Sequence, residues 1–184
     1  MSHFTYAPLR QLPYCCVAAC VLMVLNRRKL DRFSQPHIGY ALGLAVPPEF
    51  RTKFPKSRKK KPSSGWGTEV ENPKYSLNHF FTKNNLPLHE TCCFPKTISE
   101  LQQVLQQHIG KADLLVCIQV VTWGHVLLVK NFSDSTVTLI DPATAKTKKV
   151  SLRVLFNSIQ RHGKANRAGV WVISDNSPVI HRRR

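Results

Sequence analysis

The sequence predicts an α+β fold in which an N-terminal helical part precedes a C-terminal antiparallel β-sheet. Three observations support this prediction. The run from Cys16 to Leu25 is apolar on every side and too long for an average strand, so we expect a buried helix there. After Leu114 the pattern changes to short β-branched and aliphatic runs, which are typical of strands. Finally, 184 residues with 42% hydrophobic side chains suffice for one domain with a sizeable core.

The N-terminal helices have recognisable ends. The helix that begins at Cys16 ends in Arg27–Lys29, and these cations suit the negative end of a helix dipole. Ser34 is expected to cap a short second helix, with Pro36 in its first turn and Gly43 beyond its end.

The middle of the chain has the weakest structural signals. Residues 48–64 combine several prolines with the basic run Arg58–Lys61 and no apolar period, so we expect an exposed, mobile insertion. Residues 73–84 have the apolar spacing of a helix, and residues 86–94 have the composition of a strand.

The second half of the chain predicts two helices and a hairpin-rich sheet. Thr97 and Glu100 have the spacing of a capping box for the first helix, which Gly110 ends. Ser151 is expected to cap the second helix, and Gly163 to close it. The predicted strands are residues 114–121, 125–132, 136–140 and 168–174, with a hairpin turn at residues 133–135.

The charge of the chain is strongly positive. It carries 27 Lys and Arg residues against 10 Asp and Glu residues, a formal net charge of +17. Two clusters, residues 51–61 and Arg182–Arg184, contain many of these cations. We therefore expect one domain over residues 1–175 and a basic tail over residues 176–184. Such clusters are most often solvated, but the loop at 51–61 is also a candidate site for an anionic partner, such as nucleic acid or an anionic membrane surface.

Location and cysteine usage are predicted from what the sequence lacks. No stretch of about 18 apolar residues is present, so we expect no membrane span. Residues 1–11 do not have the pattern of a signal peptide, so we expect a cytoplasmic protein, or alternatively an effector delivered without such a signal. The six cysteines include two adjacent pairs and no Cys-x-x-Cys, so we expect free thiols and no structural zinc.

Four residues form a candidate catalytic set. Cys16 begins the buried helix, where the positive end of the dipole favours a thiolate nucleophile. His125 opens a predicted central strand and would transfer protons, and Asp141 ends the next strand and would orient the imidazole. Gln11 precedes Cys16 closely enough to offer an amide donor to an oxyanion. Each residue also has an ordinary structural interpretation: Cys16 and His125 in the core, and Asp141 in a turn.

The same residues carry a resemblance to a known family. Gln11-Leu-Pro-Tyr-Cys-Cys16-Val-Ala-Ala-Cys-Val-Leu-Met23 resembles the nucleophile segment of the bacteriocin-leader (double-glycine) peptidases, which are papain-like cysteine peptidases. Trp123-Gly-His125 and the later Leu-Ile-Asp141-Pro142 are similar to the family's second half, where a Gly-His strand is followed by a hairpin that ends in Asp-Pro. The resemblance covers roughly residues 11–28 and 123–144.

The resemblance implies a papain-like fold and a cysteine hydrolase that cleaves a peptide or amide bond of a peptide or protein substrate. Cys16 would attack, His125 would carry the proton, Asp141 would hold the imidazole and Gln11 would stabilise the oxyanion. No metal or organic cofactor is needed. The same set serves deamidation or acyl transfer, as in a toxin or effector, and these alternatives stay open.

Two positions depart from the family pattern. Val17 stands where the family commonly has Gly, and the spacing from Gln11 to Cys16 is about one residue shorter. A non-catalytic papain-like binding module with a basic loop is therefore a second hypothesis. A further alternative concerns the adjacent thiol, Cys15, which lies outside the helix register that Cys16 shares with Met23.

Overall fold

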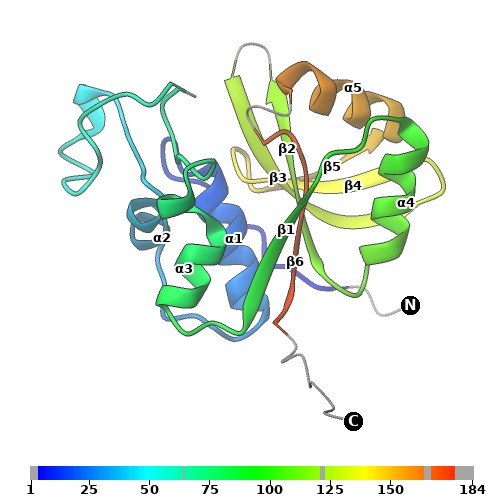
Figure 1. Cartoon of the computed structure of the whole chain (residues 1–184), viewed down its shortest axis with the longest axis horizontal. Coiled ribbons are helices and arrows are strands. Elements are labelled where there is room, and N and C mark those ends of the chain that lie inside the picture. Colours follow the sequence, from blue (N-terminus) through cyan, green and yellow to red (C-terminus); the bar gives the residue numbers. More distant parts are fainter. Residues whose placement is uncertain (1–3, 64, 121–122, 164–166, 177–184) are drawn as a thin grey trace, which may run out of the picture.

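One antiparallel sheet, with helices on both faces, organises the molecule (Figure 1). The computed structural model describes residues 4–63, 65–120, 123–163 and 167–176. The sheet has six strands in the order β1-β6-β2-β3-β4-β5, and every neighbouring pair is antiparallel. The predicted α+β class is therefore confirmed. The strands are β1 (Leu88–Cys93), β2 (Asp113–Val120), β3 (Trp123–Ser133), β4 (Thr136–Asp141), β5 (Lys146–Ser151) and β6 (Gly169–Asp175).

The helices form two groups around this sheet. The N-terminal group contains α1 (Cys16–Arg27), α2 (Gln35–Ala41) and α3 (Leu77–Lys83), with short 3₁₀ turns at Pro48–Phe50 and Pro73–Tyr75. The other group contains α4 (Ile98–His108) and α5 (Leu152–His162). None of the helices in the described ranges is both long and apolar enough to cross a membrane.

Side-chain hydroxyls begin the helices where the sequence predicts. The hydroxyl oxygens of Ser34, Thr97 and Ser151 accept hydrogen bonds from backbone N–H groups in the first turns of α2, α4 and α5, at 3.1–3.4 Å. The capping box is displaced by one residue, because the Glu100 carboxylate accepts from the N–H of Lys96 rather than that of Thr97.

The structure differs from the prediction at two elements. The helix expected over residues 73–84 is divided at Ser76, whose backbone is extended and whose hydroxyl caps α3. Strand β5 was not predicted, because its sequence, Lys-Thr-Lys-Lys-Val-Ser, has a single apolar side chain. It lies at the edge of the sheet, where pairing with β4 and little burial are enough to keep a strand.

The alternation of side chains along the central strands divides the core into two layers. In β2, Leu115 and Cys117 pack with α1, whereas Leu114 and Val116 pack with α4 and α5. Strands β3 and β6 alternate in the same way, so both faces of the sheet are covered. Helix α1 packs on β3, which brings its N-terminus to the strand that contains His125.

The segment expected to be an exposed insertion is partly packed. Phe54 is 1% exposed and joins the core around α1, and Ala45 pairs with Arg58 in a short bridge. Arg58 also forms an ion pair with Glu69. The prediction of exposure is therefore wrong at Phe54, because one aromatic side chain suffices to anchor the segment, but it is right for Lys59–Lys61. The predicted basic tail lies, apart from Asn176, outside the described residues.

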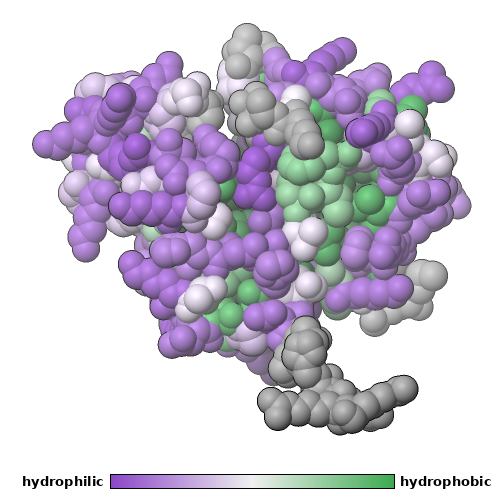
Figure 2. Space-filling view, in the orientation of Figure 1, coloured by the Kyte–Doolittle hydropathy of each residue, from purple (hydrophilic) through white to green (hydrophobic). Residues whose placement is uncertain are grey.

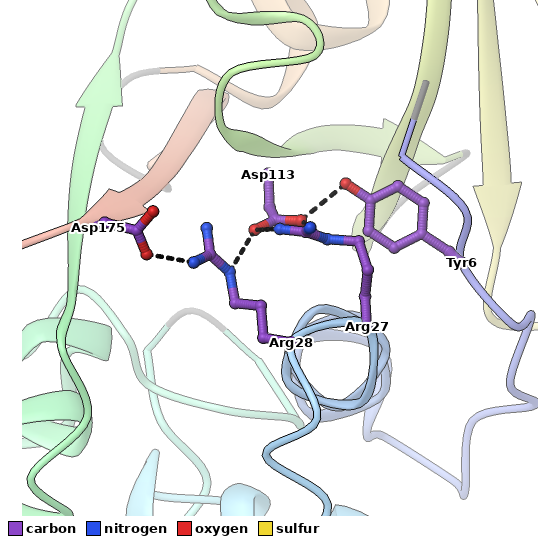
Figure 3. A network of polar contacts seen from close by, with 5 residues as sticks. All are labelled: Tyr6, Arg27, Arg28, Asp113 and Asp175. Atoms are coloured by element: carbon purple, nitrogen blue, oxygen red, sulfur yellow. Dashed lines mark hydrogen bonds and ion pairs between the residues drawn. The ribbon is translucent and has the colours of Figure 1, made fainter. Parts of the chain in front are cut away.

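A buried ionic cluster, which we name the Asp113 clamp, fixes the C-terminal end of α1 (Figure 3). Asp113 is fully buried at the start of β2 and accepts hydrogen bonds from Arg27 at 2.7 Å, Arg28 at 2.8 Å and the Tyr6 hydroxyl at 2.8 Å. Arg28 also pairs with Asp175 at the end of β6. Since Cys16 lies at the other end of the same helix, the clamp sets the direction in which α1 presents its N-terminus.

Candidate active site

Cys16 is the first residue of α1 and follows a tight turn. The N–H of Cys15 donates to the carbonyl of Leu12 at 3.0 Å, and Tyr14 has a left-handed backbone with φ 63°. The Tyr14 ring packs edge-on against Phe50, with ring centroids 5.4 Å apart. The first helical hydrogen bond runs from Ala19 N–H to Cys15 O at 2.8 Å. The N–H groups of the first turn are therefore available to an anion, such as a thiolate or an oxyanion.

His125 lies between Cys16 and Asp141. It is 8% exposed and sits near the start of β3, opposite Ile118 on β2. Its Nε2 hydrogen-bonds the Oδ1 atom of Asp141 at 2.8 Å, and the ring also hydrogen-bonds the Cys16 side chain. Because Nε2 is occupied by Asp141, the ring has Nδ1 left for Cys16. This is the arrangement that a thiol, a proton carrier and an orienting acid require.

The charges around His125 favour its protonated form. Burial lowers the pKa of His125, but hydrogen bonds to Cys16 and Asp141, together with their charges, outweigh burial and raise it overall. Burial raises the pKa of Asp141, but hydrogen bonds from Lys148, His125 and the Ala143 N–H lower it overall. The pair is therefore biased towards an imidazolium and a carboxylate.

Asp141 is fixed by partners that the sequence analysis did not identify. The Ala143 N–H donates to its Oδ1 atom at 3.0 Å, and the Lys148 Nζ group donates to its Oδ2 atom at 2.8 Å. The register between β4 and β5 pairs Lys148 with Leu139, so Lys148 lies diagonally across from Asp141 on the same face. Lys148 was not identified because β5 was not predicted: its sequence has one apolar side chain and no apolar alternation.

Gln11 lines the same cavity as Cys16 and His125. Its backbone N–H donates to the carbonyl of Pro142 at 2.7 Å, which ties this segment to the residue after Asp141. Its side-chain Oε1 atom is buried and has no hydrogen-bond partner among the described residues. Most buried side-chain polar atoms have a hydrogen-bond partner, and rotation of the amide by a half-turn exchanges this oxygen for an N–H₂ donor that faces the cleft.

The cavity at the site is an open cleft of about 820 Å³. The helical part contributes Val17, Lys61, Trp66 and Glu71 to it, and the sheet-bearing part contributes residues from β2, β3 and the end of α5. Trp123 is 58% exposed beside it. The ring of His162 approaches the backbone of Gly124 so closely that a Cβ atom on Gly124 would lie 2.5 Å from its Nε2 atom. A side chain at this position would therefore displace His162 from the cleft wall.

The other cysteines occupy different environments from Cys16. Cys15 is fully buried, and burial raises its pKa to about 12. Burial also raises the pKa of Cys20, whose thiol donates to the Val126 carbonyl at 3.4 Å, and that of Cys117. The pKa of Cys92 is raised by burial to about 11. Of the adjacent pair, Cys16 is the half-buried thiol that lines the cleft, whereas Cys15 packs in the core.

The four predicted site residues thus lie together: Cys16, His125 and Asp141 in a continuous contact, and Gln11 in the same cleft. Within the described ranges, no three His, Cys, Asp or Glu side chains are grouped so as to hold a metal ion. No family model matches the chain, and no curated protein matches it significantly. The geometry of the site therefore carries the functional argument.

Proposed function

We propose that the protein is a papain-like cysteine hydrolase that cleaves a peptide or amide bond through Cys16, His125 and Asp141. The observation that carries the proposal is the contact from the thiol at the start of α1, through the His125 ring, to the Asp141 carboxylate. The division into a helical part that bears the thiol and an antiparallel sheet that bears the histidine and the acid supports the papain-like assignment.

The reaction follows from these positions. The Cys16 thiolate attacks the carbonyl carbon, and the oxygen takes up the negative charge beside the first-turn N–H groups and the Gln11 amide. The His125 imidazolium then gives its proton to the departing amine, so that the C–N bond breaks and a thioester remains. Water attacks the thioester while His125 accepts its proton, and the acid product leaves as the thiolate and imidazolium form again. Asp141 keeps the ring in place throughout.

The same chemistry with other leaving groups and acceptors gives deamidation or acyl transfer. We favour hydrolysis of a peptide bond because the cleft is open and large enough for an extended chain rather than a single small group. We also place the reaction in the cytoplasm, because all six cysteines are free and the nucleophile must remain reduced.

Val17 supports a second candidate function, a non-catalytic binding module. It lines the cleft directly beside Cys16, at the position where the related peptidases commonly have Gly. A valine there narrows the space next to the oxyanion. In this case the cleft would hold a peptide without cleaving it.

A peptide-library experiment tests these functions together. The protein and its Cys16→Ser variant are incubated with a random peptide library, and the products are identified by mass spectrometry. New termini that depend on Cys16 support hydrolysis, conversion of glutamine to glutamate supports deamidation, and cross-linked products support acyl transfer. Unchanged peptides that nevertheless remain bound would favour the binding module over the enzyme.

A further inference from the structure

Two cations face the cleft from opposite parts of the molecule. Lys61 belongs to the helical part, and Arg161 lies in the last turn of α5 on the sheet-bearing part. Both side chains are exposed, and both line the cleft that contains Cys16 and His125. The ion pairs among the described residues use neither of them.

Lys61 ends a basic segment, residues 51–61, that is attached to the body of the protein. The Arg51 guanidinium donates to the carbonyl of Lys59 at 2.7 Å, and the N–H of Arg58 donates to the carbonyl of Leu44 at 2.8 Å. The Lys61 Nζ group lies 5.9 Å from the ring centroid of Trp66, another residue of the cleft. The segment, cyan in Figure 1, lies in a region that is almost wholly hydrophilic in Figure 2.

The cleft has few negative charges to balance these cations. Glu71 is the one carboxylate among the described residues that line it. His125 does not change this balance, because its imidazolium is paired with the Asp141 carboxylate. A ligand that brings its own carboxylates would therefore meet a complementary surface at Lys61 and Arg161.

We infer that the cleft binds a peptide with acidic side chains on both sides of the reacting amide, one facing Lys61 and the other facing Arg161. This inference rests on the proposed function, since it names the substrate class of the same site. An acidic peptide suits the cleft better than a nucleic acid, because a continuous phosphate backbone would also meet Glu71. In a peptide, by contrast, a neutral or basic residue can lie against Glu71.

Two alkylating reagents of nearly equal size test the inference at Cys16. Iodoacetate carries a negative charge and iodoacetamide does not, so the ratio of their rate constants reports the electrostatic potential in the cleft. Rates are measured near pH 6, where an ordinary thiol of pKa about 8.5 is almost wholly protonated and reacts slowly. We expect the native ratio to favour iodoacetate and to fall as salt is added.

Charge-reversal variants separate the local effect from the net charge. Lys61→Glu and Arg161→Glu change the cleft, whereas Lys53→Glu and Arg153→Glu make the same change at exposed positions outside it. We expect the iodoacetate-to-iodoacetamide ratio to fall about fivefold in each cleft variant and to stay near the native value in the controls. Equal falls in all four variants would overturn the inference, because net charge alone would then explain the preference.

Protection of Cys16 from iodoacetamide identifies the kind of ligand. The probes are a decapeptide of Glu and Gly, one of Lys and Gly, and a single-stranded oligodeoxynucleotide. Protection by the acidic peptide that is lost in Lys61→Glu and Arg161→Glu supports the inference. Protection by the oligodeoxynucleotide alone, or by the basic peptide, overturns it. If Cys16 reacts with neither reagent faster than an ordinary thiol, the proposed function itself fails, which is a separate result.

Discussion

The two ends of α1 both carry reactive or ionisable side chains, yet their surroundings differ. At the C-terminal end, both carboxylate oxygens of Asp113 are bonded within the clamp, and the group is fully buried. At the N-terminal end, Cys16 is half-buried at an open cleft, and Gln11 has an amide oxygen without a partner among the described residues. The polar groups at the C-terminal end are satisfied and hold the helix in place, whereas the N-terminal end is the site of the proposed reaction.

The helix dipole is used in opposite ways at these ends. Arg27 lies in the last turn, where a cation stabilises the negative end of the dipole. The first turn contains no acidic residue, so the positive end remains available for the charge that would develop during the proposed reaction. We therefore expect substitutions at the N-terminal end of α1 to affect function and substitutions at its C-terminal end to affect stability.

The largest effect is expected at the reactive end. Cys16→Ser removes the nucleophile, so we expect rapid alkylation at pH 6 and any hydrolysis to fall by at least about 10³-fold, with an unchanged melting temperature. Labelling with iodoacetamide and peptide mapping measures the first quantity. Cys15→Ser is the matched control and should keep rapid labelling, since Cys15 packs in the core. Labelling that survives in Cys16→Ser and vanishes in Cys15→Ser would transfer the nucleophile to Cys15.

The next largest effect is expected at the Asp113 clamp. Asp113→Asn leaves Arg27 and Arg28 without their buried carboxylate, so we expect the free energy of unfolding to fall by about 3–5 kcal/mol. Denaturant titration measures this loss. Asp175→Asn is the control: its side chain is 68% exposed, so it should cost less than about 1 kcal/mol. Alkylation of Cys16 in the folded fraction should stay near the native rate, and a large fall in that rate would show that the two ends are coupled.

A smaller effect is expected at Asp141, which orients His125 rather than reacting. Asp141→Ala removes the hydrogen bond to Nε2, whereas Asp141→Asn keeps an oxygen there. We expect turnover to fall by about 10²-fold or more in the Ala variant and by less in the Asn variant. Steady-state hydrolysis of the peptide found in the library experiment compares the two. Native activity in both variants would remove Asp141 from the site.

The sequence predicted the parts of the site that rest on local patterns. A run such as the one after Cys16 has few alternatives to a buried helix, and the hydroxyl caps at Ser34, Thr97 and Ser151 depend on neighbours within one turn. The same kind of local pattern placed Cys16 at the start of a helix, His125 at the start of a strand and Asp141 at the end of the next strand.

Contacts between distant segments were not predicted. The Asp113 clamp joins residues that are far apart in sequence, and Asp113 belongs to no local motif. The edge strand β5 is polar because it is exposed to solvent, so it lacks the apolar alternation that indicates a strand. Without β5, the position of Lys148 beside Asp141 could not be predicted. Phe54 looked like part of an exposed segment because a single aromatic residue gives no periodic signal.

The smallest effect is expected for Lys148, whose charge acts on the site through Asp141. Lys148 helps to lower the pKa of Asp141. Because the Lys148 ammonium contacts the carboxylate that pairs with His125, we expect its positive charge to disfavour protonation of His125 as well. Lys148→Met should therefore raise the pKa of both groups.

Since the pKa of His125 is already above its ordinary value, stability from its protonated form is complete below about pH 6.5 and is lost as pH rises through the folded-state pKa. In the variant, this loss and the alkaline fall of Cys16 alkylation by iodoacetate, whose negative charge the His125 imidazolium attracts, should both move to higher pH, by less than about 1 unit because the Lys148 side chain is 40% exposed. The measurement is the rate of iodoacetate labelling across the pH range at low and high salt, with Lys149→Met, an exposed lysine on the same strand, as the control. A shift to lower pH, or an equal shift in Lys149→Met, would show that Lys148 does not control the charge of the pair.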